Sequence, residues 1–138
     1  MRLAKLMKYS GLLFNDAVCW VTFDGAYDFG YLVKALTHRI LPQGLREFLL
    51  LIGIYFGKRV YDVKHLMTFC FDLYGGLEGV CHYLHVNWVV RKIHQASSDN
   101  LLTLYLFHNI KHNYFHHHTN YAMLKYSSVL YGLYYLHS

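Results

Sequence analysis

The pattern of hydrophobic and polar positions along the chain predicts mostly helices, with two short strands among them. The residues from Cys19 to Phe23 are β-branched or aromatic, which is typical of a short buried strand. Val60–Val63 has the same character, and Asp62 within it is placed to cap the helix that follows. We therefore expect short strands embedded in a mainly helical chain.

The apolar spacing along the rest of the chain is helical in several stretches. These are Leu3–Tyr9, a helix from Ala26 onward, Leu45–Phe56, Lys64–Leu73, Leu77–Leu84 and Asp99–Phe115, followed by a partly helical tail from Tyr121 to Ser138. Leu45–Phe56 is apolar nearly all round, so we expect it to be covered on several sides. Because the chain has no internal repeat and no dividing linker, residues 1–138 are predicted to form a single domain.

A carboxylate occupies an unusual place in the helix that begins at Ala26. Asp24 precedes this helix as a candidate cap. On a helix of about 3.6 residues per turn, Asp28 falls on the same side as Leu32 and Ala35. We therefore expect Asp28 to lead the core-facing stripe of a helix that leaves the end of a strand, a common position for a metal ligand.

A second aspartate, Asp99, has a similar position in the first turn of the last long helix. His94 lies five residues earlier, on the loop that enters this helix. Together with Asp28, these side chains suit a hard cation such as Mg²⁺ and metal-assisted attack of water, with the histidine as general base. The alternative is structural, since an aspartate at a helix start is often a cap or a partner of the helix dipole. Spacing alone leaves both interpretations open.

Composition narrows the class of protein. The 138 residues are 55% hydrophobic and 18% aromatic, which excludes a disordered chain, and the net charge of +5 is compatible with a polyanionic partner. Cys19, Cys70 and Cys81 form no CxxC motif, so we expect reduced thiols in an intracellular protein. No apolar run approaches the roughly 20 residues of a membrane span, and we expect no membrane partner. We interpret the fourteen tyrosines as mostly amphipathic filler around a core, and not as a stacking platform.

The histidines near the end of the last long helix form a possible alternative site. His108, His112 and His116 fall at i, i+4 and i+8, a spacing at which neutral imidazoles can bind zinc. No cysteine or acidic residue completes a tetrahedral set. We therefore favour an exposed polar face over a zinc site.

Four motifs occur in order along the chain: Trp20-Val-Thr-Phe with Tyr27-Asp-Phe-Gly-Tyr-Leu, then Val60-Tyr-Asp-Val-Lys-His-Leu-Met, then Gly75-Gly-Leu, then His94-Gln-Ala-Ser-Ser-Asp-Asn-Leu-Leu-Thr103. At this spacing they closely resemble the Caf-one/Pop-two deadenylases, the nuclease subunits of the Ccr–Not complex. The resemblance extends from about Leu3 to Gly132 and is closest to the plant-like branch.

The resemblance implies an α/β fold of the ribonuclease H-like, DEDD exonuclease type, present in part. It implies a poly(A)-specific 3′→5′ exoribonuclease that uses two divalent ions, Mg²⁺ or Mn²⁺. By it, Asp28 matches the second acidic motif, Asp99 matches the third, and His94 matches the histidine that activates the water. The implied partners are poly(A) RNA, the Ccr–Not scaffold and a partner deadenylase, in the nucleus and cytoplasm.

The chain departs from the family pattern in one respect that affects activity. The family's first motif, an Asp-x-Glu on the first strand, occurs nowhere in the 138 residues. We expect it upstream of Met1, which would make this chain N-terminally truncated and leave two of four acidic ligands. We therefore expect little or no activity from these residues alone. The alternative is a catalytically inactive paralogue or fragment that acts as an interaction module of the complex.

Overall fold

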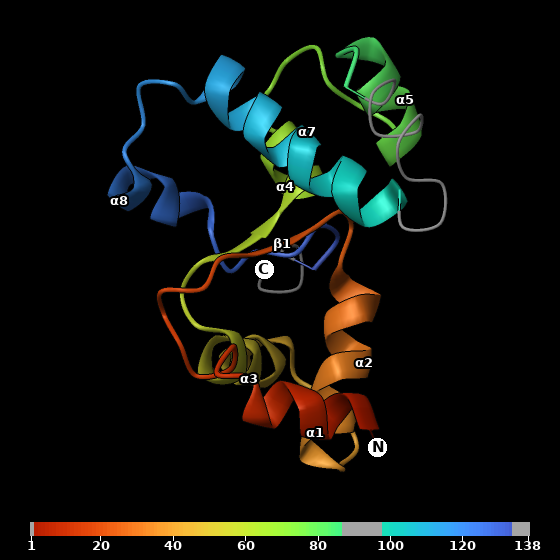
Figure 1. Cartoon of the computed structure of the whole chain (residues 1–138), viewed down its shortest axis with the longest axis vertical. Helices are drawn as coiled ribbons and strands as arrows, with labels where there is room; N and C mark the ends of the chain where they lie inside the picture. The colour runs from red at the N-terminus through yellow and green to blue at the C-terminus, as the bar shows by residue number, and fades with distance from the viewer. Residues whose placement is uncertain (1, 87–97, 134–138) are drawn as a thin grey trace.

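The computed structural model describes residues 2–86 and 98–133, with the backbone alone at positions 98 and 99. In chain order its elements are α1 (Arg2–Tyr9), β1 (Trp20–Thr22), α2 (Ala26–Thr37), α3 (Leu45–Phe56), β2 (Val60–Asp62), α4 (Val63–Met67), α5 (Leu77–Tyr83), α7 (Ser98–Tyr114), α8 (Asn120–Met123) and the 3₁₀ helix η1 (Leu124–Tyr126). Figure 1 shows α1, α2 and α3 on one side of the strands and α4, α5, α7 and α8 on the other. The prediction of short strands among mostly helices is confirmed.

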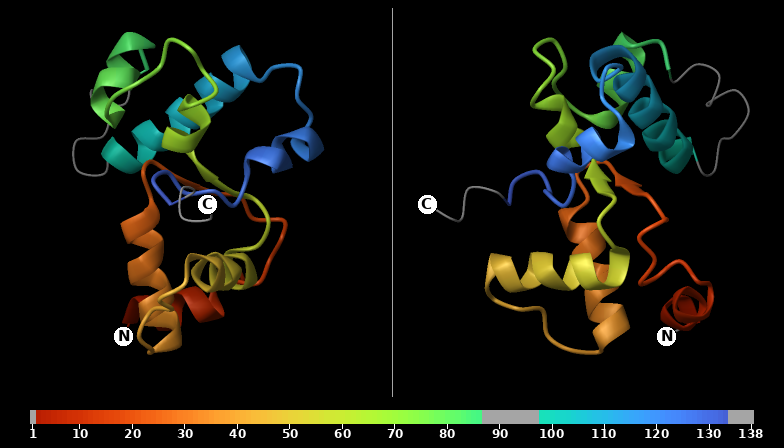
Figure 2. Two further views of the ribbon diagram at one scale, coloured as in Figure 1. Left: turned by 180° about the vertical axis from the view of Figure 1, so that it is seen from behind. Right: turned by 90° about the vertical axis from the view of Figure 1, so that its left-hand side faces the viewer.

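The two strands form the join between these groups of helices. β1 and β2 pair in parallel, with Trp20 opposite Val60 and Thr22 opposite Asp62. Successive side chains of a strand point to opposite faces. Val60 therefore packs with the group of α1, α2 and α3, while Tyr61 packs with the group that contains α7. The three views agree that both groups meet at the level of the sheet (Figures 1 and 2).

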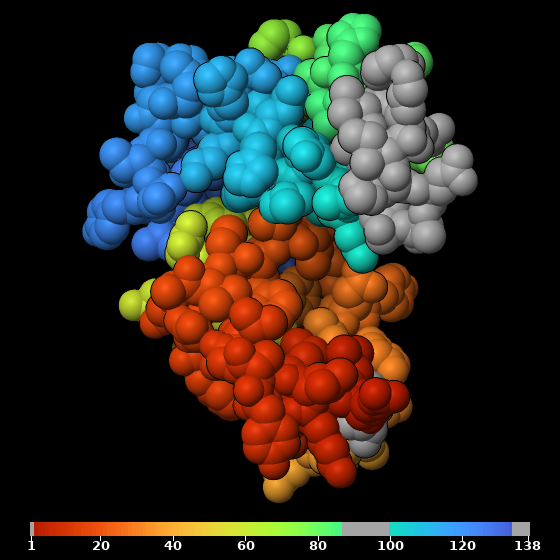
Figure 3. All heavy atoms as spheres, viewed as in Figure 1, coloured from red at the N-terminus to blue at the C-terminus, as the bar shows by residue number. Residues whose placement is uncertain are grey.

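Aromatic side chains hold the group of α1, α2 and α3 together. The rings of Phe29 on α2 and Phe56 on α3 meet at 5.0 Å between centroids, and Trp20 contacts Phe56 at the same distance. Ala4 and Met7, one turn apart on α1, are buried against this core. In the space-filling view, α1 and the segment after it cover the front of the group (Figure 3).

The other core is built on α7. Leu102, Leu106 and Ile110 are completely buried, at the spacing of one helix face. They pack against residues of α4 and α5, which include Leu66 and Cys81. The helical apolar spacing that was predicted for Asp99–Phe115 is therefore confirmed.

Two predictions about the helices are wrong. α3 has the predicted bounds, but only Ile52 and Phe56 are buried, and Leu50 is 59% exposed. The helix predicted over Lys64–Leu73 ends at Met67, because the next backbone N–H groups donate to carbonyls three residues earlier, starting with Thr68 to His65 at 3.0 Å. Such bonds tighten the chain into turns instead of continuing an α-helix.

In the segments that the structure describes, no helix is both long enough and apolar enough to span a bilayer. None of Cys19, Cys70 and Cys81 forms a disulfide, as predicted. Burial raises the pKa of Cys70 to about 12, so this thiol stays protonated at neutral pH and is a poor nucleophile.

Candidate functional site

The turn between β1 and α2 determines where the first turn of α2 lies. β1 ends at Thr22, and α2 begins at Ala26 directly after Gly25. A Cβ atom at position 25 would collide with the Thr22 side chain, so glycine is required for this close approach. Asp24 was predicted to cap α2, and this prediction is wrong. It adopts a left-handed conformation with φ of 56°, and Gly25 occupies the cap position instead.

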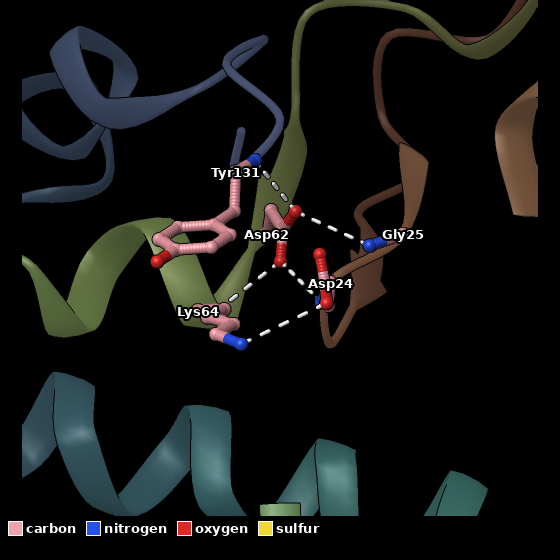
Figure 4. A network of polar contacts seen from close by, with 5 residues as sticks. All are labelled: Asp24, Gly25, Asp62, Lys64 and Tyr131. Carbon is pink, nitrogen blue, oxygen red and sulfur yellow. Dashed lines mark hydrogen bonds and ion pairs between the residues drawn. The ribbon is translucent and has the colours of Figure 1, made fainter. Parts of the chain in front are cut away.

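The buried carboxylate of Asp62 fixes this turn. It is fully buried at the end of β2. Its Oδ1 accepts hydrogen bonds from the backbone N–H groups of Asp24 (2.7 Å) and Lys64 (3.2 Å), and its Oδ2 accepts from those of Gly25 (3.2 Å) and Tyr131 (3.0 Å) (Figure 4). The predicted cap on α4 is confirmed. Asp62 also connects the start of α2 and the segment at Tyr131 to the sheet. These contacts were not predicted from the sequence.

The carboxylates of Asp62 and Asp24 are stabilised in different ways. Burial raises the pKa of the Asp62 carboxyl, and the four N–H donors offset this only in part. The Lys64 ammonium lies 3.8 Å from Oδ2 of Asp24 and 4.7 Å from the centroid of the Tyr131 ring (Figure 4). The charge of Asp24 therefore has a partner at the surface, whereas Asp62 is held by backbone dipoles.

Asp28 lies on the surface of α2 and not on its buried face. The residues of α2 that reach the core are Phe29, Gly30, Val33 and Leu36, so the prediction that Asp28 leads the core-facing stripe is wrong. The buried stripe runs through Phe29, Val33 and Leu36, one residue along from the predicted stripe. Asp28 instead lines a hollow of about 290 Å³ with residues of β1, α5 and α7, namely Val21, Thr22, Phe23, Leu77, Asn100 and Thr103.

The hollow brings together the first turns of the two helices that carry the predicted aspartates. Asn100 and Thr103 lie within the first turns of α7, and Asp99 precedes Thr103 by one turn along the same helix. His94 lies outside the described residues. No role was predicted for Asn100 or Thr103. Both belong to the motif that runs from His94 to Thr103, and Thr103 lies one helical turn after Asp99.

The side chains around the hollow suit a hard cation. A carboxylate, an amide and a hydroxyl all offer oxygen, the donor that Mg²⁺ and Mn²⁺ prefer. In residues 2–86 and 100–133, no group of three or more histidine, cysteine, aspartate or glutamate side chains is arranged to hold a metal ion. Among the described side chains, Asp28 is the one carboxylate at the hollow, and the histidines near the end of α7 form no such group.

Comparisons with known proteins agree on one family. The chain is 50% identical over 132 residues to "Probable CCR4-associated factor 1 homolog 10" of Arabidopsis thaliana, a match that covers 96% of this chain and 46% of the relative. It is 38% identical over 130 residues to "Poly(A) ribonuclease pop2" of Schizosaccharomyces pombe, covering 94% of this chain and 37% of that protein. No family model matches.

Solved structures give the same fold. Pop2p of S. pombe in its Mg²⁺- and Mn²⁺-bound form superposes with a TM-score of 0.78 at 35% identity, over 95% of this chain and 50% of that one. Yeast CAF1 co-crystallised with the NOT1 MIF4G domain gives a TM-score of 0.72 at 24% identity, over 94% and 52%. The fold is therefore that of these ribonuclease H-like RNase domains, in part.

The chain spans about half the length of the curated relatives it matches. The similarity nevertheless runs through nearly all of its own residues, in both sequence and structure. Over the part of those proteins that it spans, the chain is homologous to the CCR4-associated factor 1 and Pop2 proteins.

Proposed function

We propose that this chain supplies part of a poly(A)-specific 3′→5′ exoribonuclease that removes adenylates from mRNA tails. The observation that carries the proposal is the hollow in which Asp28 of α2 lies beside Asn100 and Thr103 of α7. The family relationship supplies the reaction, because one relative is named a poly(A) ribonuclease.

In this proposal Asp28 and Asp99 hold a divalent ion, Mg²⁺ or Mn²⁺. Each belongs to the first turn of its helix, where the helix dipole favours an ionised carboxylate. When bound, the ion would lower the pKa of a water and stabilise negative charge on phosphate oxygens. His94 takes the proton of the attacking water, whose oxygen bonds to phosphorus as the bond from phosphorus to the 3′ oxygen breaks. The 3′ oxygen takes up a proton from solvent and becomes the new 3′ hydroxyl of the RNA, and 5′-AMP is released.

The intact family site is proposed to hold two ions, and these residues alone fit one. Two closely spaced Mg²⁺ ions repel each other and need several shared carboxylates to overcome their hydration. Asp28 and Asp99 are two such ligands, and the sequence contains no Asp-x-Glu to add to them. We therefore expect little or no turnover from the 138 residues by themselves.

A chimera tests the proposed function. The segment of the Arabidopsis relative that precedes the region of similarity is joined to the N-terminus of this chain, because identity of 50% favours matching contacts. With Mn²⁺, the folded chimera is expected to shorten a 5′-labelled RNA with an oligo(A) 3′ end and to leave an oligo(U) end intact. The 138-residue chain is expected to leave both RNA ends intact. A folded chimera without oligo(A) shortening, or equal activity from this chain alone, would contradict the proposal.

A second candidate function is a non-catalytic interaction module of the Ccr–Not complex. It is favoured by the missing Asp-x-Glu, and by the fold that the chain shares with CAF1 crystallised with the NOT1 MIF4G domain. Binding to a purified MIF4G domain that survives Asp28→Asn, together with an inactive chimera, would favour the module. We propose the scaffold and a partner deadenylase as partners under either function.

A further inference from the structure

A second cavity lies along α2, apart from the hollow at Asp28. It has a volume of about 680 Å³, within the range of small-molecule sites. Its walls come from α2, from the loop that enters α3 and from the C-terminal segment, and are mostly apolar. The residues that line it include Asp24, Tyr27, Tyr31, Lys34, Phe48 and Tyr131.

Two exposed tyrosines of α2, Tyr27 and Tyr31, line this cavity. Tyr27 is 92% exposed and Tyr31 is 59% exposed. They are one turn apart, so they lie on the same face of the helix. The interpretation of the tyrosines as core filler is wrong for this pair. Exposed aromatic rings at helical spacing next to a cavity have the character of a stacking surface.

The charge of the cavity wall favours an anionic ligand. Lys34 follows Tyr31 on the same face of α2, and within the described parts of the chain no carboxylate pairs with it. The one carboxylate in the wall is that of Asp24, whose Oδ2 lies 3.8 Å from the Lys64 ammonium. That ammonium also stands over the Tyr131 ring. The remaining positive charge is therefore that of Lys34.

We propose that this cavity binds bases of a single-stranded, adenine-rich RNA. Successive bases stack on Tyr27 and Tyr31, and Lys34 contacts a backbone phosphate, the combination that single-strand binding surfaces use. The inference rests on the proposed function and extends it. Because α2 carries both these tyrosines and Asp28, a strand held in the cavity is delivered along one helix to the hollow where its 3′ end reacts.

Binding is measured by the fluorescence anisotropy of a labelled ten-nucleotide oligo(A) with the 138-residue chain in EDTA, so that no hydrolysis occurs. Tyr27→Ala and Tyr31→Ala are each expected to raise the Kd about tenfold, from the loss of one stacked base. Tyr27→Phe keeps the ring and stays within about twofold. Lys34→Gln lowers the slope of log Kd against log salt by about one.

Tyr121→Ala is the matched control, because Tyr121 is 85% exposed on α8 and does not line the cavity. It is expected to leave the Kd unchanged within about twofold. The inference is overturned if Tyr27→Ala and Tyr31→Ala behave like Tyr121→Ala, or if these substitutions abolish self-association and not RNA binding. It is also overturned if the wild-type chain does not bind oligo(A) at about 100 μM, the weak end of non-specific affinity.

The two proposals fail separately. Binding in EDTA needs neither a metal ion nor turnover, so a tyrosine-dependent Kd supports the cavity even if the chimera is inactive. If the chimera is active but the Kd for oligo(A) is the same in Tyr27→Ala and Tyr31→Ala as in the wild-type chain, the RNA-binding role of the cavity is excluded. The proposed function is then unaffected.

Discussion

Asp28→Asn is expected to lower the initial rate of oligo(A) shortening by the chimera at least about 100-fold. Substitutions in the outer shell of a metal site already cost about 10- to 100-fold, and Asp28 is proposed as a direct ligand. Asparagine keeps the size of the side chain and removes its charge. Since Asp28 is exposed and makes no core contact, the variant should unfold at the same temperature as the parent chimera.

The matched control for this experiment is Asp16→Asn. Asp16 is also exposed, and its Oδ1 accepts the backbone N–H of Lys58 at 3.2 Å, which an asparagine oxygen can still do. This variant should retain the parent rate within about twofold. Asp99→Asn should match Asp28→Asn, and His94→Gln should lose about 10²- to 10⁴-fold, the usual contribution of a general base. Full activity of Asp28→Asn would exclude Asp28 as a ligand.

Asp62→Ala is expected to lower the free energy of unfolding by about 3–5 kcal/mol, as when one partner of a buried charged network is removed. The substitution leaves four N–H groups without their acceptor, those of Asp24, Gly25, Lys64 and Tyr131. Urea unfolding of the 138-residue chain measures this. Asp62→Asn should be intermediate, because its amide NH₂ would face two N–H donors. Asp16→Ala, at an exposed site, should cost less than about 1 kcal/mol.

The pH dependence of this loss has a definite sign. Because the pKa of Asp62 is raised in the folded protein, the native state binds this proton more tightly than the unfolded chain does. The contribution of Asp62 to stability is therefore largest below its unfolded pKa of about 3.9, and it falls as the pH rises through the folded pKa. The cost of Asp62→Ala should thus be greater at about pH 3.5, which is below the unfolded pKa, than at about pH 7. A cost that grows with pH would contradict this assignment.

Local sequence pattern was sufficient for much of the fold, because glycine and strand residues mark the element ends. α3 has the predicted bounds since Gly44 and Gly57 flank it, and at Gly57 a φ of 81° stops the helix. Whether α3 is covered depends on the rest of the fold, and an apolar sequence cannot reveal that. Leu50 is accordingly exposed against prediction.

The candidate site was predicted in part for a related reason. α2 carries two overlapping apolar stripes, one through Leu32 and the other through Phe29 and Val33, and only packing decides which faces the core. The position of Asp28 on the helix was therefore predicted, but its orientation was not. The bonds of Asp62 to Gly25 and Tyr131 join residues 37 and 69 positions apart, and no local pattern encodes such contacts.

The most direct test of the central claim is where a divalent ion binds on this chain. Mn²⁺ is titrated into the ¹⁵N-labelled 138-residue protein, and paramagnetic broadening of the amide signals locates the ion. We expect broadening around Asp28, Asn100 and Thr103 at about 0.1–1 mM, the affinity of sites with few carboxylates, and its loss in Asp28→Asn but not in Asp16→Asn. Broadening confined to the histidines of α7, or unchanged in Asp28→Asn, would contradict the account.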